Sequence, residues 1–288
     1  MESEHAYEAR DGARLAYRRW RAPERTGSAP LVLIHGAASN LTRWSEFLGG
    51  TRLARTRDIV RLDLRGHGAS RWRGPTSLES WSDDTAAILR REGIGRAVLV
   101  GHCLGANVAV TFAARRPDAV AGLVLVEPML SAALVGRLRR LRRFVPLLRA
   151  AIAVVRWLNR AGLHRRSLAT LDLQALDRAF RARLAEPGGA EALERRYASV
   201  CADLRIMPTA GYLQDLVETV RPLPLAALRA PFLALVSTGR TFVDPVRTQA
   251  ILSGLPNGTV HPLRCRHWIP TEAPAEMRTA IEAWLEER

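Results

Sequence analysis

Short, almost fully apolar runs recur along the chain and predict buried strands. Residues 31–34 (LVLI), 97–100 (AVLV) and 123–126 (LVLV) contain no polar side chain, and residues 231–236 (PFLALV) repeat the pattern. Residues 58–64 (DIVRLDL) form a similar run with three polar positions. A strand that is covered on both faces shows such a run instead of an alternation of apolar and polar residues.

Helical periodicity fills the intervals between these runs. Residues 77–92 and 104–115 place apolar side chains at helical spacing, and Pro117 follows the second segment. The alternation of strand and helix predicts an α/β fold, with a mostly parallel sheet and helices on both faces. The other expected elements are two strands around Asp11-Gly12 within residues 6–20, a helix at 246–253, a strand at 258–263 and a helix at 273–287.

The pattern changes after residue 128. Residues 129–171 hold ten arginines and no acidic residue, and residues 172–220 also have helical periodicity. No strand is expected within 129–225, which we interpret as a helical cap (lid) inserted into a core formed by 1–128 and 226–288. One apolar stripe with a basic opposite face, broken at Pro146, is expected at Leu134, Leu138, Leu141, Val145, Leu148, Ile152 and Val155.

The charged residues of the chain exclude some kinds of catalysis and of binding partner. The 43 basic residues are all arginine, and the net charge is +15. Without lysine, neither Schiff-base catalysis nor a lysine-containing phosphate loop is available. A GC-rich coding bias and an acidic partner would each produce this balance. No basic cluster is interleaved with stacking aromatic residues and no nucleic-acid-binding motif is present, so no nucleic-acid partner is expected.

The cysteines and the apolar segments indicate a compartment. Cys103, Cys201 and Cys265 are odd in number and do not have the spacing of a metal site. The first residues are polar and acidic, unlike a signal peptide. The apolar region 144–158 is too short for a membrane span and contains arginine. We therefore expect a cytoplasmic protein without a metal, a cofactor or a transmembrane segment.

The segment GHCLG (101–105) stands between a predicted strand and a predicted helix. It fits the G-x-nucleophile-x-G elbow, in which a strained turn requires residues with almost no side chain on either side of the nucleophile. The helix N-terminus would direct backbone N–H groups at the reacting oxygen and lower the pKa of a thiol. Many cysteines are only small buried apolar residues, which is our interpretation of Cys201 and Cys265. At the apex of the elbow, Cys103 would face a pocket.

Together with three further motifs, this elbow resembles the α/β-hydrolase fold superfamily. By that resemblance Cys103 is the nucleophile, and His267 is the general base and later the general acid. The resemblance also implies an oxyanion hole formed by the backbone N–H groups of Ala37 and Leu104. The four motifs, in the order that the superfamily has, are IHGA (34–37), DLRGHGAS (63–70), GHCLG (101–105) and RCRHWIPTEAP (264–274).

The loops around these motifs contain other polar residues with expected structural roles. Asp63 and Arg65 are expected to fix the DLRGHGAS loop through a local ion pair. His35, His67 and His102 are interpreted as supports of the loops and the elbow.

The acidic member of the triad departs from the superfamily pattern. The resemblance places an acid in the turn after residues 231–236, but Arg240 stands at the expected position and Asp244 follows four residues later. A second solution in the superfamily puts the acid at the end of the preceding parallel strand, where this chain has Glu127. We favour Glu127 over Asp244. A thiol also needs this acid less than a serine hydroxyl does, because it ionises more readily.

A cysteine nucleophile suits acyl transfer from thioesters, because one thiolate replaces another. The elbow is similar to those of polyhydroxyalkanoate synthases, dienelactone hydrolases and some thioesterases of polyketide or nonribosomal peptide assembly. The chain is short for the first group and has a helical insert that the second lacks. The expected function is therefore a thioesterase or acyltransferase with a small-molecule acyl substrate and a Cys-His-acid triad.

The positive charge of the predicted cap indicates what kind of partner the protein would bind. Acyl carrier proteins are acidic and coenzyme A is polyanionic, so an arginine-rich lid would steer either toward the pocket. A basic amphipathic helix can also bind anionic lipid. Two alternatives to the thioesterase stay open: a lactone or ester hydrolase with chemistry of the dienelactone-hydrolase type, and a non-catalytic or cyclase-like binding protein, which Arg240 favours.

Overall fold

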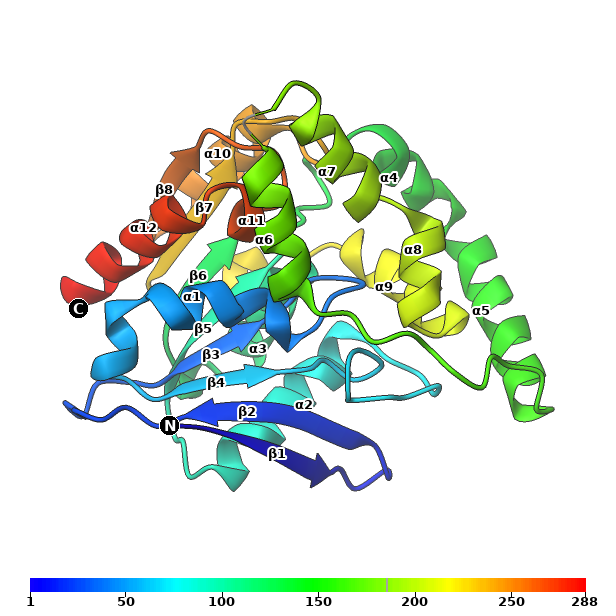
Figure 1. Ribbon diagram of the computed structural model, residues 1–288, viewed down its shortest axis with the longest axis horizontal. Helices are drawn as coiled ribbons and strands as arrows, with labels where there is room; N and C mark the ends of the chain where they lie inside the picture. The colour runs from blue at the N-terminus through cyan, green and yellow to red at the C-terminus, as the bar shows by residue number, and fades with distance from the viewer. Residues whose placement is uncertain (185) are drawn as a thin grey trace.

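The computed structural model describes residues 1–184 and 186–288, and an eight-stranded sheet forms its centre (Figure 1). The strand order is β1-β2-β4-β3-β5-β6-β7-β8, in which β1 and β2 are antiparallel to their neighbours and the other strands are parallel. The strands are β1 (Glu2–Glu8), β2 (Arg14–Trp20), β3 (Leu31–Ile34), β4 (Ile59–Leu62), β5 (Ala97–His102), β6 (Val120–Val126), β7 (Phe232–Ser237) and β8 (Gly258–Leu263).

Helices cover both faces of the sheet, which explains the fully apolar strands. Val32 and Ile34 of β3 pack with the layer of α2 (Leu78–Arg91), α3 (Leu104–Arg115) and α10 (Pro245–Ser253). Leu31 and Leu33 of the same strand pack on the opposite face, with α1 (Ser45–Gly50) and α12 (Pro274–Glu286). Because successive side chains of a strand point to opposite faces, every position of β3 is buried.

The predicted α/β architecture is confirmed, with differences at particular elements. The first strand begins at Glu2, before the predicted residue 6. Its side chains alternate between half-buried and exposed at the sheet edge, so it lacks the apolar run that marks the other strands. The sequence reading missed the short helices η1 (Leu41–Trp44), η2 (Arg52–Arg55) and α11 (Ile269–Glu272), as well as α1. These segments are too short to show a helical period.

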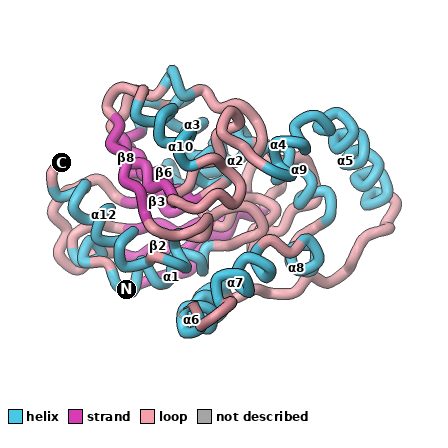
Figure 2. The backbone as a smooth tube through the Cα atoms, turned by 90° about the horizontal axis from the view of Figure 1, so that it is seen from above, coloured by secondary structure: helices cyan, strands magenta, loops and turns pink. Residues whose placement is uncertain are grey.

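In the described part of the segment between β6 and β7, the regular elements are helices, apart from an isolated bridge between Leu134 and Val243. They lie beyond the carboxyl ends of the parallel strands (Figures 1 and 2). We call residues 129–225 the helical insert, and its division from the core as a cap stays our prediction. Its helices are α4 (Gly136–Leu141), η4 (Arg142–Phe144), α5 (Val145–Arg160), α6 (Leu173–Arg183), α7 (Gly189–Tyr197), α8 (Val200–Ile206) and α9 (Thr209–Thr219).

The predicted break of the basic segment falls slightly earlier than Pro146. The chain turns through η4, and Pro146 lies in the first turn of α5. Proline is tolerated there because the first N–H groups of a helix have no partner within the helix. In the described part of the chain, no helix is both long and apolar enough to cross a bilayer.

Candidate active site

The turn between β5 and α3 holds Cys103 in a strained conformation. Its backbone angles are φ 54° and ψ −117°, a combination that residues other than glycine rarely adopt. A Cβ atom on Gly101 would overlap the carbonyl group of Gly105, and one on Gly105 would overlap the carbonyl oxygen of Ile34. The GHCLG spacing is thus required by close packing of the backbone around Cys103.

Two backbone N–H groups lie near the thiol of Cys103 and lower its pKa. They belong to Leu104, at the start of α3, and to Ala37, in the loop after β3. Burial nevertheless raises the pKa of the Cys103 thiol to about 12, since the two N–H groups, which lower it, do not offset desolvation. The expected lowering of this pKa by the helix N-terminus is therefore wrong for the free protein, in which the thiol is protonated.

His267 is buried between β8 and α11, with its ring against several aromatic side chains. The ring of Phe242 stands edge-on at 4.7 Å between centroids, and that of Trp268 at 5.5 Å. Burial, and then the positive charge of Arg43, lowers the pKa of His267 to about 3. His267 is therefore neutral at physiological pH.

Glu127 follows β6 and points at His267. Its Oε1 atom lies 3.8 Å from Nδ1 of His267, a nitrogen that has no hydrogen-bond partner among the described residues. The Glu127 carboxylate accepts hydrogen bonds from the Ser237 backbone N–H (2.7 Å) and hydroxyl (2.9 Å). Burial raises the pKa of Glu127 to about 8 despite these two hydrogen bonds. A shift of about 1 Å would join Glu127 and His267 by a hydrogen bond, and such bonds are often long before substrate binds.

Asp244, the other candidate acid, is engaged elsewhere. It is the N-cap of α10, where its carboxylate accepts a hydrogen bond from the Arg247 backbone N–H at 3.1 Å. It also forms an ion pair with Arg240 at 3.3 Å. Of the two predicted acids, the structure brings Glu127 to His267.

The polar loop residues are arranged differently from the expectation. The carboxylate of Asp63 accepts hydrogen bonds from the backbone N–H groups of Leu41 (2.7 Å) and Ala69 (2.8 Å). Arg65 instead pairs with Asp84 at 2.6 Å and with Asp11. The predicted local ion pair between Asp63 and Arg65 is wrong, because Asp63 binds backbone N–H groups and Arg65 finds its carboxylates in distant segments that the sequence does not mark.

Histidines beside the elbow do support the loops. His35 accepts a hydrogen bond from the Leu64 backbone N–H at 3.0 Å, so it joins the loops that follow β3 and β4. His102 donates from Nε2 to the carbonyl oxygen of His267 at 3.2 Å. His102 therefore holds the backbone of the histidine loop against the elbow.

A second buried pair joins the helical insert to the loops after β3 and β4. Asp215 of α9 lies 2.7 Å from Nε2 of His67 and accepts a hydrogen bond from the Ala38 backbone N–H at 3.4 Å. Burial lowers the pKa of His67, but the Asp215 carboxylate outweighs burial and the pKa lies above its usual value. Asp215 could not be predicted from the sequence, since no local motif surrounds it.

A buried ion pair beside the site was also missed. Nη1 of Arg43 donates to both carboxylate oxygens of Asp177 (2.7 and 2.8 Å) and to the hydroxyl of Thr271 (2.6 Å). The hydroxyl of Tyr197 donates to the same carboxylate. This cluster ties η1 and α11 to α6 and α7 of the insert. Arg43 is one arginine among 43, so composition gives it no distinguishing signal.

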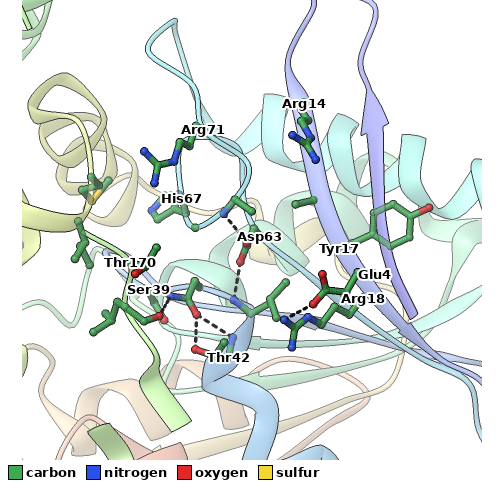
Figure 3. Close-up of a pocket in the computed structure, with 18 of the residues that line it drawn as sticks. Glu4, Arg14, Tyr17, Arg18, Ser39, Thr42, Asp63, His67, Arg71 and Thr170 are labelled. Carbon is green, nitrogen blue, oxygen red and sulfur yellow. Dashed lines mark hydrogen bonds and ion pairs between the residues drawn. The ribbon is translucent and has the colours of Figure 1, made fainter. Parts of the chain in front are cut away.

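Cys103 and His267 line one small cavity of about 50 Å³ beneath the insert. A larger cavity of about 480 Å³, shown in Figure 3, lies beside it and shares Ala38, Ser39 and Leu171 with it. The first has room for a few water molecules and not for an acyl chain. An acyl substrate would therefore require Leu171 and its neighbours to move. Within residues 1–184 and 186–288, no cluster of three or more histidine, cysteine or acidic side chains could hold a metal ion.

Known proteins match the sequence of this chain over about a third of its length. Lipase LipV of Mycobacterium tuberculosis is 38% identical over 106 residues, which cover 36% of this chain and 38% of the lipase. The 2-(acetamidomethylene)succinate hydrolase of Mesorhizobium japonicum is 38% identical over 104 residues, or 35% of this chain and 36% of that enzyme. The matches thus span well under half of these relatives.

Solved structures match over the whole length. A thermophilic esterase from Thermogutta terrifontis covers 100% of this chain with a TM-score of 0.69 at 22% identity, and 98% of the esterase is matched. At this identity the likeness shows the fold alone. The sequence model described as the alpha/beta hydrolase fold matches residues 29–274, most of the chain. Together with the strand order and the elbow, this match shows that the chain belongs to the α/β-hydrolase fold family.

Proposed function

We propose that this protein is a cysteine acyl-enzyme, a thioesterase or acyltransferase that acts on acyl thioesters. The observation that carries the proposal is the position of Cys103. It stands on a strained elbow with two backbone N–H groups beside its thiol, in a cavity that His267 shares. A cysteine buried only for packing requires neither the strained backbone nor the N–H groups.

In the proposed reaction, the Cys103 sulfur attacks the carbonyl carbon of the substrate while His267 takes the thiol proton. The N–H groups of Ala37 and Leu104 stabilise the oxyanion, and the Glu127 carboxylate stabilises the imidazolium through Nδ1. As the bond to the leaving thiol breaks, His267 returns the proton to that thiol. The acyl group then remains on Cys103 as a thioester until an acceptor, activated by His267, removes it.

The pKa values favour proton transfer during the attack over a resting ion pair. The thiol of Cys103 has a pKa of about 12 and His267 a pKa of about 3, so both are neutral before substrate binds. This resembles the way a serine is activated by its base. Since thiolate replaces thiolate, acylation by a thioester is nearly balanced in energy, whereas acylation by an alkyl ester must expel a more basic alkoxide.

The second candidate is an ester or lactone hydrolase that uses the same residues. The names of the relatives favour it, because they include a lipase and an esterase. The third candidate, a non-catalytic binding protein, drew support from Arg240 at the expected acid position. That support weakens because Glu127 lies beside His267.

Intact mass spectrometry distinguishes these candidates. Mixing the protein with an acyl thioester of N-acetylcysteamine is expected to add the mass of the acyl group, and peptide mapping is expected to place it on Cys103. A nitrophenyl ester of the same acid serves as the comparison. Turnover of the ester without turnover of the thioester would select the ester hydrolase. No adduct and no turnover with either compound would select the binding protein.

The pH dependence tests the role of Glu127. Because its pKa is raised to about 8, Glu127 is protonated below this value and cannot stabilise the imidazolium. We therefore expect kcat/KM to rise with pH and to level off above about 8. His267 stays neutral over this range and adds no further step.

Two variants serve as controls for the predicted pH dependence of kcat/KM. Glu127→Gln is expected to lower kcat/KM at least about tenfold and to remove the rise near pH 8. Asp244→Asn is expected to keep the wild-type profile, because its carboxylate caps α10. A rise that survives in Glu127→Gln and disappears in Asp244→Asn would reverse the assignment of the acid.

A further inference from the structure

The outer surface of the helical insert exposes large apolar side chains. Eight such side chains are exposed in the described part of the chain, and five of them lie within residues 144–163. The five are Phe144 (56% exposed), Leu147 (67%), Val154 (57%), Trp157 (64%) and Leu163 (66%). Single exposed apolar residues are ordinary, but a concentration of this kind marks an interaction site.

Three of these residues, Leu147, Val154 and Trp157, lie on α5, on a side of the helix that is exposed in the described structure. The helix packs against α9, with Ile152 buried and Val145 half-buried on its inner side. Leu147, Val154 and Trp157 follow one another at intervals of seven and three residues, so they form one line on the outer side. Figures 1 and 2 show α5 at the periphery of the molecule. A surface helix is normally polar on its outer side, and α5 is apolar on both sides.

Positive charge surrounds this apolar line. Residues 129–171 contain ten arginines and no acidic residue, and nine of the ten side chains are exposed. Within residues 1–184 and 186–288, none of the ten forms a salt bridge. Other exposed arginines of the protein, such as Arg52 and Arg55, do pair with glutamates. The surface thus combines exposed apolar side chains with positive charge that the chain itself does not neutralise.

A cavity of about 620 Å³ continues this surface at the end of α5. Val155, Leu158 and Leu163 give it apolar walls, and Arg165 and Arg166 place positive charge beside them. Its lining has the same combination of apolar and cationic groups as the helix surface.

We propose that α4, η4 and α5 bind the surface of a bilayer that contains anionic lipid. The exposed apolar line of α5 would enter the boundary between headgroups and acyl chains, and the arginines would contact the lipid phosphates. A tryptophan such as Trp157 prefers this boundary. A second copy of the chain fits this surface less well, because it would place unneutralised arginines against one another. An acidic acyl carrier protein would match the charge, but it would leave the large apolar side chains without a hydrocarbon phase.

Co-sedimentation with lipid vesicles tests the proposal on the full chain. We expect the protein to bind vesicles of phosphatidylcholine mixed with phosphatidylglycerol at least tenfold more tightly than vesicles of phosphatidylcholine alone. The double variant Leu147→Asp/Val154→Asp is expected to lose at least tenfold of this binding. The matched control is Val246→Asp, which changes an even more exposed apolar side chain (76%) on α10 and is expected to bind like the wild type.

Separate readouts keep this proposal distinct from the catalytic one. The melting temperature and the hydrolysis of a soluble nitrophenyl ester check that each variant is folded, and neither depends on the vesicles. Equal binding to both vesicle types, no vesicle binding by the wild type, or unchanged binding by the double variant would each overturn the proposal. Self-association in gel filtration, or capture of an acidic acyl carrier protein, without vesicle binding would assign the surface to that partner instead.

Discussion

Replacing Cys103 by alanine is expected to lower turnover of acyl thioesters at least about 10³-fold, because it removes the nucleophile and leaves only the oxyanion-hole donors. The chain supplies matched controls. Cys201 is exposed on α8, and Cys265 lies at the end of β8 beyond the site cavity. Cys201→Ala and Cys265→Ala are expected to keep activity near the wild-type level. Steady-state kinetics with a thiol-reactive dye in the assay would measure all three variants.

A serine at the same position adds a second test. In Cys103→Ser, the backbone N–H groups and His267 stay in place while the nucleophile becomes an alcohol. We expect thioester turnover to fall more than ester turnover, since the advantage of thiolate exchange is lost. Activity in Cys103→Ala within a few-fold of the wild type would rule out the acyl-enzyme altogether.

Replacing Asp177 by alanine is expected to have the largest effect on stability. The change leaves the guanidinium of Arg43 buried without its carboxylate partner, and both side chains are almost inaccessible to solvent. Removing one member of a buried pair destabilises a protein by about 3–5 kcal/mol. Urea unfolding followed by circular dichroism would measure the free energy of unfolding.

Two further variants serve as controls for Asp177→Ala. Glu191→Ala removes a surface ion pair to Arg266, and it is expected to change stability little. The double variant Arg43→Met/Asp177→Leu removes both charges and is expected to recover most of the lost stability. If Asp177→Ala were as stable as Glu191→Ala, the buried pair would not hold the insert to the core.

Regularly repeated features of the chain could be predicted from its sequence. Apolar runs such as residues 31–34 indicate strands because helices bury both faces of the sheet, and that arrangement leaves no polar position. The glycines at 101 and 105 indicate the elbow because any side chain there would overlap the backbone. The ends of parallel strands meet at one edge, so motifs after β3, β5 and β6 converge.

Features that depend on the depth of burial or on distant partners could not be predicted. The helix N-terminus suggested a lowered thiol pKa, but the pKa of Cys103 is set by desolvation, which requires knowing what covers the elbow. Asp177 lies 134 residues from Arg43, and no periodicity links the two. Arg65 likewise finds Asp84 instead of the nearby Asp63.

The contacts of Asp215 couple the insert to the loop that carries Ala37. One carboxylate oxygen meets both His67 and the N–H of Ala38, a residue held at φ 46°. If α9 moves with Leu171 when a substrate enters, the same movement removes the hydrogen bond that supports Ala38, the residue beside the proposed oxyanion donor Ala37. An open molecule would then bind without reacting, and a closed one would react without exchanging ligands. Such a molecule separates in time the choice of substrate from the making and breaking of bonds, so a bound acyl chain is shielded from water while α9 is closed.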